Sequence, residues 1–292
     1  MKKIIYLIGF LFLAVSARAQ ISIVVAPEAA PVQIKAVDIK AEILANMAFT
    51  AYDITFYNPN DRILEGKFSL ALAENQRVLA FALDVNGKMR DGVPADITLP
   101  AKDMRRALIT VEENLKPDNG AYNYVLPLDF GQLADFSLRV DARRQATAPR
   151  AADNPFDNFG FTAWNESFTA SFKAKNYTPS GKLNIAVPME NTVKVYTHEA
   201  EGNTYFFAAV PAASKTAKLT SVAYDKKKVE EVLYNTGDII MLTGILNFKE
   251  AYIDLNFTDG ETKYKQRVYL DKKHRNSYAR NIYMQQKTGI IW

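Results

Sequence analysis

Cysteine is absent from this chain of 292 residues, and histidine occurs only at His198 and His274. The lack of cysteine excludes disulfide bonds, thiolate metal sites, a cysteine nucleophile and a lipid-bearing cysteine behind a signal peptide. Two histidines leave little material for acid–base or zinc chemistry. Phosphate-binding glycine loops, dinucleotide fingerprints and the Gly-x-Ser-x-Gly nucleophile elbow are also missing. We therefore predict that the protein is not an enzyme, binds no cofactor, and has no catalytic, cofactor-binding or metal-ligating residue.

The two histidines are poor candidates for a Ser-His-Asp triad. His198 follows the edge of a predicted strand at residues 193–197. His274 lies among three cations, and no neighbouring carboxylate is placed to orient its ring (Lys272, Lys273 and Arg275).

Carboxylates occur in two adjacent pairs, Glu112-Glu113 and Glu230-Glu231. Neighbours in sequence point in different directions on a helix, so we interpret both pairs as solvated faces and not as acid/base pairs. The loop at residues 153–158 offers oxygen ligands that calcium accepts. It lacks the glycine and the distal glutamate of a calcium loop, which favours an ordinary polar turn.

The N-terminus has the three regions of a secretory signal peptide. Lys2 and Lys3 give a positive start, residues 4–15 form an apolar run too short to span a bilayer comfortably, and Ala17-Arg18-Ala19 supplies the small residues of a cleavage site. This pattern predicts a signal peptide at residues 1–19, cleaved before Gln20. No later segment reaches about 18 uninterrupted apolar residues, so we predict no transmembrane segment after cleavage.

Most of the basic excess belongs to the predicted signal peptide. The whole chain has 36 basic and 32 acidic residues, and residues 1–19 contain three basic residues and no acidic one. The remaining chain, with 33 basic against 32 acidic residues, gives no reason to expect binding to nucleic acid. From residue 262 to the end, eight basic residues stand against Asp271 alone. This segment is either a solvated helix face or a weak contact for an anionic surface.

Alternation with a period of two indicates that the first part of the chain is rich in strands. The alternation runs through residues 37–51, shifts phase near Tyr52-Asp53, where we expect a bulge, and ends at the turn 58–61. Asn86-Gly87, directly after a strand-like run, predicts a two-residue hairpin. Pro100 precedes apolar residues at helical spacing, which predicts one helix in this part of the chain (Met104, Leu108, Val111 and Leu115).

A composition break at residues 146–160, rich in alanine, proline, aspartate and asparagine, is interpreted as a linker. It separates a unit at residues 30–145 from a second strand-rich unit at residues 161–271. Residues 272–292 are predicted to form a basic helical tail. The predicted fold class is therefore mainly β: a β-sandwich with one helix, followed by a second antiparallel β unit and a short C-terminal helix.

The order of features in the first unit is informative. A long alternating strand ends in an Asn-Pro turn, Glu65 precedes a short strand, another strand leads to Val85-Asn86-Gly87, and Gly92 precedes the predicted helix. From Val37 to about Leu115 this order resembles the VIT domain, the N-terminal module of inter-alpha-trypsin inhibitor heavy chains and of many secreted bacterial proteins. The resemblance implies a secreted interaction module of the β-sandwich type, without catalysis.

VIT domains are commonly followed by a von Willebrand factor A domain, which binds a divalent cation through Asp-x-Ser-x-Ser. The nearest stretch in this chain is Asp135-Phe136-Ser137-Leu138-Arg139. It places a cation where a ligand hydroxyl is needed, and it falls inside a predicted strand. The resemblance is therefore to a VIT protein of the bacterial secreted type, without a recognisable A-domain metal site.

These observations predict a non-catalytic, exported protein-interaction or adhesion module of the cell envelope, with an envelope or extracellular protein as its partner. The alternative is a carbohydrate-binding module or a glycan-active enzyme, because β-sandwiches with surface aromatics host both. The lack of cysteine in an exported chain favours a bacterial envelope over an animal secretory route. The sequence leaves periplasmic, cell-surface and secreted locations open.

Overall fold

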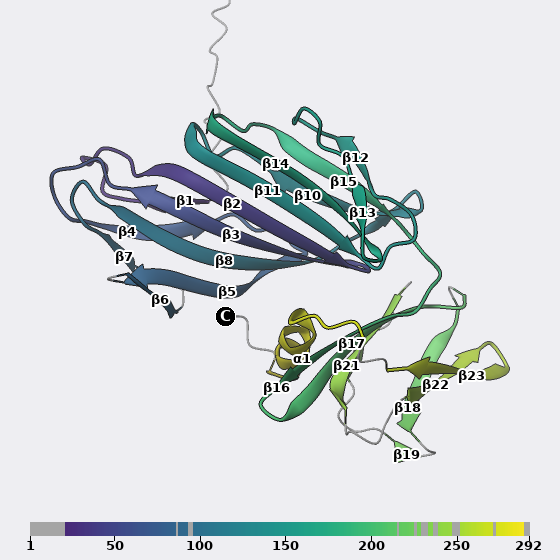
Figure 1. Ribbon diagram of the computed structural model, residues 1–292. Helices are drawn as coiled ribbons and strands as arrows, with labels where there is room; N and C mark the ends of the chain where they lie inside the picture. Colours follow the sequence, from purple (N-terminus) through teal and green to yellow (C-terminus); the bar gives the residue numbers. More distant parts are fainter. Residues whose placement is uncertain are drawn as a thin grey trace, which may run out of the picture.

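The structure, a computed structural model, describes residues 21–85, 87–92, 96–214, 216–224, 227–228, 233–235, 239–246, 252–270 and 273–288. The predicted signal peptide and the carboxylate pair Glu230-Glu231 lie outside the described residues. Figure 1 shows two β units, with one helix packed between them in the described part of the chain.

An eight-stranded sheet forms one layer of the N-terminal unit (Figure 1). Its strands follow the order β13-β14-β11-β2-β3-β8-β5-β6. All neighbours are antiparallel except β2 and β11, which run parallel. The strands are β2 (Gln33–Leu44), β3 (Met47–Tyr57), β5 (Gln76–Val85), β6 (Lys88–Asp91), β8 (Met104–Asn114), β11 (Leu133–Arg143), β13 (Thr162–Trp164) and β14 (Ser167–Tyr177).

Two smaller sheets cover the inner face of this large sheet. Their strand orders are β1-β4-β7 and β12-β15-β10-β9. The strands are β1 (Ile21–Val24), β4 (Leu64–Leu70), β7 (Asp96–Leu99), β9 (Pro117–Asp118), β10 (Ala121–Pro127), β12 (Arg150–Asp153) and β15 (Lys182–Pro188). Side chains from all three sheets form one buried apolar cluster, which makes the N-terminal unit a two-layer sandwich.

The second unit is a smaller pair of four-stranded sheets with a core of its own. The first sheet contains β16 (Lys194–Ala200), β17 (Asn203–Pro211), β20 (Leu233–Asn235) and β21 (Ile239–Leu246). The second contains β18 (Lys218–Tyr224), β19 (Lys227–Lys228), β22 (Tyr252–Asp259) and β23 (Thr262–Tyr269). Helix α1 (Tyr278–Thr288) packs on β16, β17 and β21.

The mainly β fold class with a short C-terminal helix is confirmed. The hairpin expected around residues 86–87 is also present, because Val85 pairs with Lys88 across the turn. In the part of the chain that the structure describes, no helix has the length and hydropathy needed to cross a membrane.

The helix predicted after Pro100 is wrong. Residues 104–114 form strand β8, which pairs with β3 on one side and β5 on the other. Met104, Leu108 and Val111 fit a helical spacing, but burial in this segment follows the period of two of a strand. Ala107, Ile109 and Val111 are the buried residues of that alternation. The β-branched run Ile109–Thr110–Val111 favours a strand because its side chains fit a pleated surface.

The phase shift expected as a bulge near Tyr52-Asp53 has another origin. The register between β2 and β3 is continuous there, with Ile39 opposite Tyr52. The chain reverses instead at Ala45-Asn46, where Ala45 adopts a φ of 56°. A two-residue hairpin turn, which needs positive φ, therefore resets which side chains face the core.

Residues 146–160, interpreted from composition as a linker, form part of the sandwich. They contain β12, which pairs with β15, and Phe156, which is buried in the sandwich core. Strands β14 and β15 also belong to the sandwich, since they pair with β11 and β10. The N-terminal unit thus reaches Pro188, and the second unit begins at β16.

Asn58, at the end of β3, is 0% exposed although its side chain is polar. Its Nδ2 donates to the carbonyl oxygens of Arg62 at 2.9 Å, Leu99 at 3.2 Å and Pro100 at 2.9 Å. Its Oδ1 accepts a hydrogen bond from the backbone N–H of Asn60 at 2.9 Å. The Asn-Pro turn therefore ties the end of β3 to the end of β7 through three backbone carbonyl groups, of which that of Leu99 is bonded in a buried position.

Glu113 lies on the inner side of β8 and is buried, contrary to the prediction of a solvated face. Its carboxylate accepts hydrogen bonds from Asn75 Nδ2 at 3.1 Å and Gln76 Nε2 at 2.9 Å. Burial raises the pKa of Glu113, although both hydrogen bonds act to lower it. Its charge adds to the effect of burial in raising the pKa of Tyr52.

Replacing Asn58 with alanine should lower the free energy of unfolding by about 2–4 kcal/mol, because three backbone carbonyl groups lose their donor and the one of Leu99 is buried. Chemical denaturation followed by circular dichroism measures this loss. Asn203, an exposed asparagine, is the control, and Asn203→Ala should change stability by less than about 0.5 kcal/mol. Equal losses for the two variants would contradict the role given to Asn58.

Glu113→Gln should make the protein progressively more stable than wild type as pH rises. A carboxyl group whose pKa is raised on folding binds its proton more tightly in the folded state, so it lowers stability as pH rises above its ordinary value of about 4.3. The glutamine variant lacks this penalty. Urea titrations between about pH 4 and pH 7 test the sign, and a stability difference that stays constant or falls with pH would refute it.

Candidate functional site

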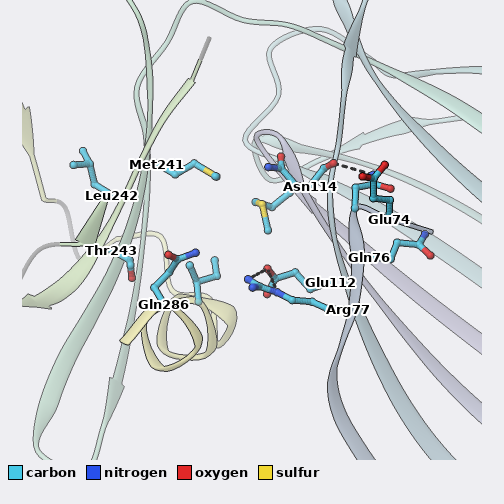
Figure 2. A pocket seen from close by; sticks show the side chains of 12 residues that line it. Glu74, Gln76, Arg77, Glu112, Asn114, Met241, Leu242, Thr243 and Gln286 are labelled. Atoms are coloured by element: carbon cyan, nitrogen blue, oxygen red, sulfur yellow. Dashed lines mark hydrogen bonds and ion pairs between the residues drawn. The ribbon is translucent and has the colours of Figure 1, made fainter. Parts of the chain in front are cut away.

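A cavity of about 260 Å³ lies where the sandwich, the second unit and helix α1 meet (Figure 2). We call it the junction cavity. Its lining comes from β3, β5, β8, β21, α1 and the turn before β5. The lining residues are Met47, Glu74, Asn75, Gln76, Arg77, Glu112, Asn114, Met241, Leu242, Thr243, Ile282 and Gln286.

The elements around the cavity are held together by an apolar cluster that both units share. Phe49 of β3 stacks on Tyr278 of α1, with ring centroids 4.0 Å apart and planes 10° apart. Tyr196 stacks on Phe207 of β17 with centroids 6.2 Å apart. Met47 and Ile282, which line the cavity, belong to the same cluster. The cavity walls are therefore fixed by packed aromatic and aliphatic side chains.

Arg77 and Glu112 form an ion pair on the sandwich side of the cavity (Figure 2). They face each other directly in the register of β5 and β8. Arg77 donates to one carboxylate oxygen, Glu112 Oε1, from Nη2 and from Nε, the latter at 3.1 Å. Glu112 is only 2% exposed, and burial raises its pKa more than the Arg77 charge lowers it.

The second oxygen of this carboxylate is left without a donor. Glu112 Oε2 is buried and has no hydrogen-bond partner in the described part of the chain. Leaving one buried oxygen of a carboxylate unsatisfied is costly, because water that would solvate it has been removed. In Figure 2 the Arg77 and Glu112 side chains extend from the sheet toward helix α1 across the cavity.

Asn46 does not line the cavity, but its side chain contacts two residues that do, Asn114 and Met241. Asn46 Nδ2 donates to Asn114 Oδ1 at 3.1 Å and approaches Met241 Sδ at 3.5 Å, which joins the two units. Asn46 Oδ1 is buried and has no partner among the described residues. The unsatisfied atoms beside the cavity are thus hydrogen-bond acceptors.

The described lining offers little material for a nucleophile. The hydroxyl of Thr243 is its one alcohol among the described residues, and it donates to the carbonyl oxygen of Phe206 at 2.9 Å. An activated nucleophile needs a base within hydrogen-bond reach. Glu112 is paired with Arg77, and Figure 2 shows it on the opposite side of the cavity from Thr243.

The histidines weighed as triad members lie elsewhere. His274 Nδ1 is 3.9 Å from Glu166 Oε2, but the Glu166 side chain is 73% exposed, unlike the buried acid that orients a catalytic imidazole. The hydroxyl of Ser167, in the same shallow cavity, donates to the Asn165 carbonyl at 3.4 Å. His198 lies half-buried on β16, opposite Tyr205 in the adjacent strand.

The stretch Asp135–Arg139 lies on β11, as expected for a strand, with its polar groups engaged by neighbours. Ser137 donates to Asp38, and Arg139 forms a two-pronged pair with Asp141. In the loop at 153–158, Asn154 Oδ1 accepts from the Phe156 N–H at 3.0 Å, which shapes a turn that buries Phe156. Within the described ranges, no group of three or more acidic, histidine or cysteine side chains is placed to hold a metal ion.

Cations of the basic segment that begins at residue 262 pair with acids of the second unit. Arg267 donates to Asp254 at 2.8 Å and 3.0 Å, and lowers the pKa of that carboxyl group. Arg280 donates to Glu201 at 2.7 Å. Part of the positive charge of this segment, predicted either to be solvated or to contact an anionic surface, is therefore neutralised within the chain.

Sequence reasoning missed the Arg77–Glu112 pair and the junction cavity. The available signal was the alternation of Ala107, Ile109 and Val111, which defines the two faces of β8. It places Glu112 and Glu113 on opposite faces, although it does not show which distant segment covers Glu112.

Comparison with solved structures gives low similarity scores. A nutrient-binding protein candidate from Legionella pneumophila has a TM-score of 0.37 and 14% identity, over 57% of this chain and 68% of that one. The M1 zinc metallopeptidase of Deinococcus radiodurans has a TM-score of 0.31 and 12% identity, over 59% of this chain and 46% of that one. The β-glucuronidase of Ruminococcus gnavus has a TM-score of 0.20 and 13% identity, over 76% of this chain and 35% of that one. None of these scores supports an argument about activity.

Comparison of sequences is more informative. No curated protein matches the chain. Residues 34–99 match the family model described as Vault protein inter-alpha-trypsin domain, or VIT. The match runs from β2 to β7 and includes the buried Asn58 of the Asn-Pro turn. The chain therefore carries a VIT domain, which forms part of its N-terminal sandwich.

Proposed function

We propose that this protein is an exported, non-catalytic protein-interaction module of a bacterial cell envelope. The VIT domain at residues 34–99 is the observation that carries the proposal, because the family module implies an interaction role. The junction cavity is consistent with it, since the one hydroxyl group among its described lining residues, that of Thr243, already donates to the Phe206 carbonyl oxygen.

The position of the first strand supports export. Strand β1 begins at Ile21, one residue after the predicted mature N-terminus, and pairs with β4. Ile21 is completely buried in the sandwich core. Removal of residues 1–19 would therefore leave the folded unit whole, with its first core strand at the new N-terminus.

The edge strand β23 is the surface that we assign to the partner. It ends its sheet in the described part of the chain, so one side of its backbone is available to an added strand. Tyr269 on this strand is 66% exposed, and Tyr side chains often anchor protein interfaces. We expect an extended segment of an envelope protein to pair along β23.

Expression of the full chain in a Gram-negative host should give a protein that starts at Gln20 and lies outside the cytoplasm. Fractionation followed by intact mass spectrometry measures both properties. Replacing Ala19 with arginine should block cleavage, because signal peptidase requires a small residue there. A cytoplasmic product that retains residues 1–19 would rule out export.

A photo-crosslinking residue at position 269 should give one dominant adduct in the native envelope, and excess unlabelled protein should suppress it. The control position is Val125, an exposed residue on β10 in the sandwich. Labelling at both positions alike, or at neither, would remove β23 as the partner surface. Purification of the adduct and titration of the partner against wild type and Tyr269→Ala would then measure the contribution of the tyrosine.

A further inference from the structure

We propose that the junction cavity binds a small aliphatic amine, with the ammonium group against Glu112 Oε2 and the alkyl chain against Met241 and Ile282. This site goes beyond the proposed interaction role and does not depend on export. It rests on three independent features of the cavity: an unsatisfied buried carboxylate oxygen, the sign of the local charge, and an apolar wall.

The unsatisfied oxygen defines what the ligand must bring. Both hydrogen bonds from Arg77 go to Glu112 Oε1, which leaves Oε2 buried without a donor in the described structure. Asn46 Oδ1, on a side chain that contacts the lining residues Asn114 and Met241, is a second buried acceptor without a partner among the described residues, although Asn46 itself does not line the cavity. A ligand that satisfies Glu112 Oε2 has to donate a hydrogen bond, and an ammonium group carries three donors and no acceptor.

The charge of the lining selects a cation. The cavity has two carboxylates, Glu74 and Glu112, and one guanidinium, Arg77. A monovalent cation therefore neutralises the lining, whereas an anion would add to a negative excess. A hydrogen bond between two charged groups is also about twice as strong as one between neutral groups.

The remaining wall selects an alkyl chain. Met47, Met241, Leu242 and Ile282 supply apolar side chains from both units and from helix α1. Methionine adapts its shape to fill irregular gaps, which suits a flexible chain. A volume of about 260 Å³ lies below the range of cavities that hold drug-sized ligands, so the amine has to be small.

The position of the cavity adds a consequence for stability. Because the walls belong to both units, the bound amine contacts the sandwich and the second unit together. A ligand that binds only the assembled junction stabilises the folded protein in proportion to the logarithm of its concentration.

The test uses pentylamine as the probe, with 1-pentanol and pentanoate as analogues of the same chain length. Isothermal titration calorimetry with the protein lacking residues 1–19 should detect saturable binding of pentylamine, and at least about tenfold weaker binding of the alcohol and of the anion. Pentylamine should also raise the melting temperature. Equal binding of the amine and the alcohol would overturn the proposal, because the carboxylate would then have no role.

Glu112→Gln should weaken pentylamine binding by about tenfold or more. The matched control is Glu65→Gln, which removes the same charge from an exposed residue of β4 outside the cavity lining and should bind like wild type. Wild-type affinity in Glu112→Gln, or equal losses in both variants, would refute the site.

A second variant keeps the proposal testable if Glu112→Gln does not fold. Glu74 is exposed, so Glu74→Lys should leave the fold intact while reversing the excess charge of the lining. We expect at least about threefold weaker binding of pentylamine to this variant. Unchanged or tighter binding would contradict the proposal.

Discussion

The stack of Phe49 on Tyr278 is the contact on which the arrangement of the two units depends. Phe49 and Met47 lie on the outer face of the eight-stranded sheet, where an isolated sandwich would expose them to water. Helix α1 and β17 bury them, together with Phe207 and Ile282, in a cluster that neither unit could form alone. Burial of large aromatic side chains stabilises a protein by several kcal/mol in total, so the second unit completes the first and is not merely attached to it.

The same contact accounts for the junction cavity. In the sheet register, Phe49 lies opposite Glu112, and Glu112 lies opposite Arg77, so an aromatic ring and an ion pair share one row on the outer face. When the second unit covers the ring, it must also cover the ion pair. Aromatic rings pack closely, whereas a charged pair that lacks a full set of hydrogen bonds cannot be sealed without cost. Because Phe49, Glu112 and Arg77 are neighbours across the sheet, a polar cavity forms directly beside the packed apolar cluster.

Much of the fold could be predicted from the sequence because its signals are local. Asn86-Gly87 specifies a tight hairpin, and the expected closure between Val85 and Lys88 is observed. The strand-rich character predicted for residues 161–271 is also observed, for example in β17 and β22. The unit boundary could not be predicted in this way. Residues 146–160 have a loop-like composition, yet Phe156 in their midst is held in the sandwich core by partners distant in sequence.

The candidate site could not be predicted because the residues of β8 were assigned the periodicity of a helix and not that of a strand. As part of a helix, Glu112 and Glu113 would both be near the surface, and their adjacency would carry no information. As part of a strand, they must face opposite layers, because successive side chains alternate. Glu113 enters the sandwich, where two amides satisfy its carboxylate, and Glu112 enters the junction, where Arg77 satisfies only half of it. The role of each carboxylate therefore depends on which face of β8 it occupies. It also depends on what covers that face, and Glu112 is covered by residues more than a hundred positions away in the sequence.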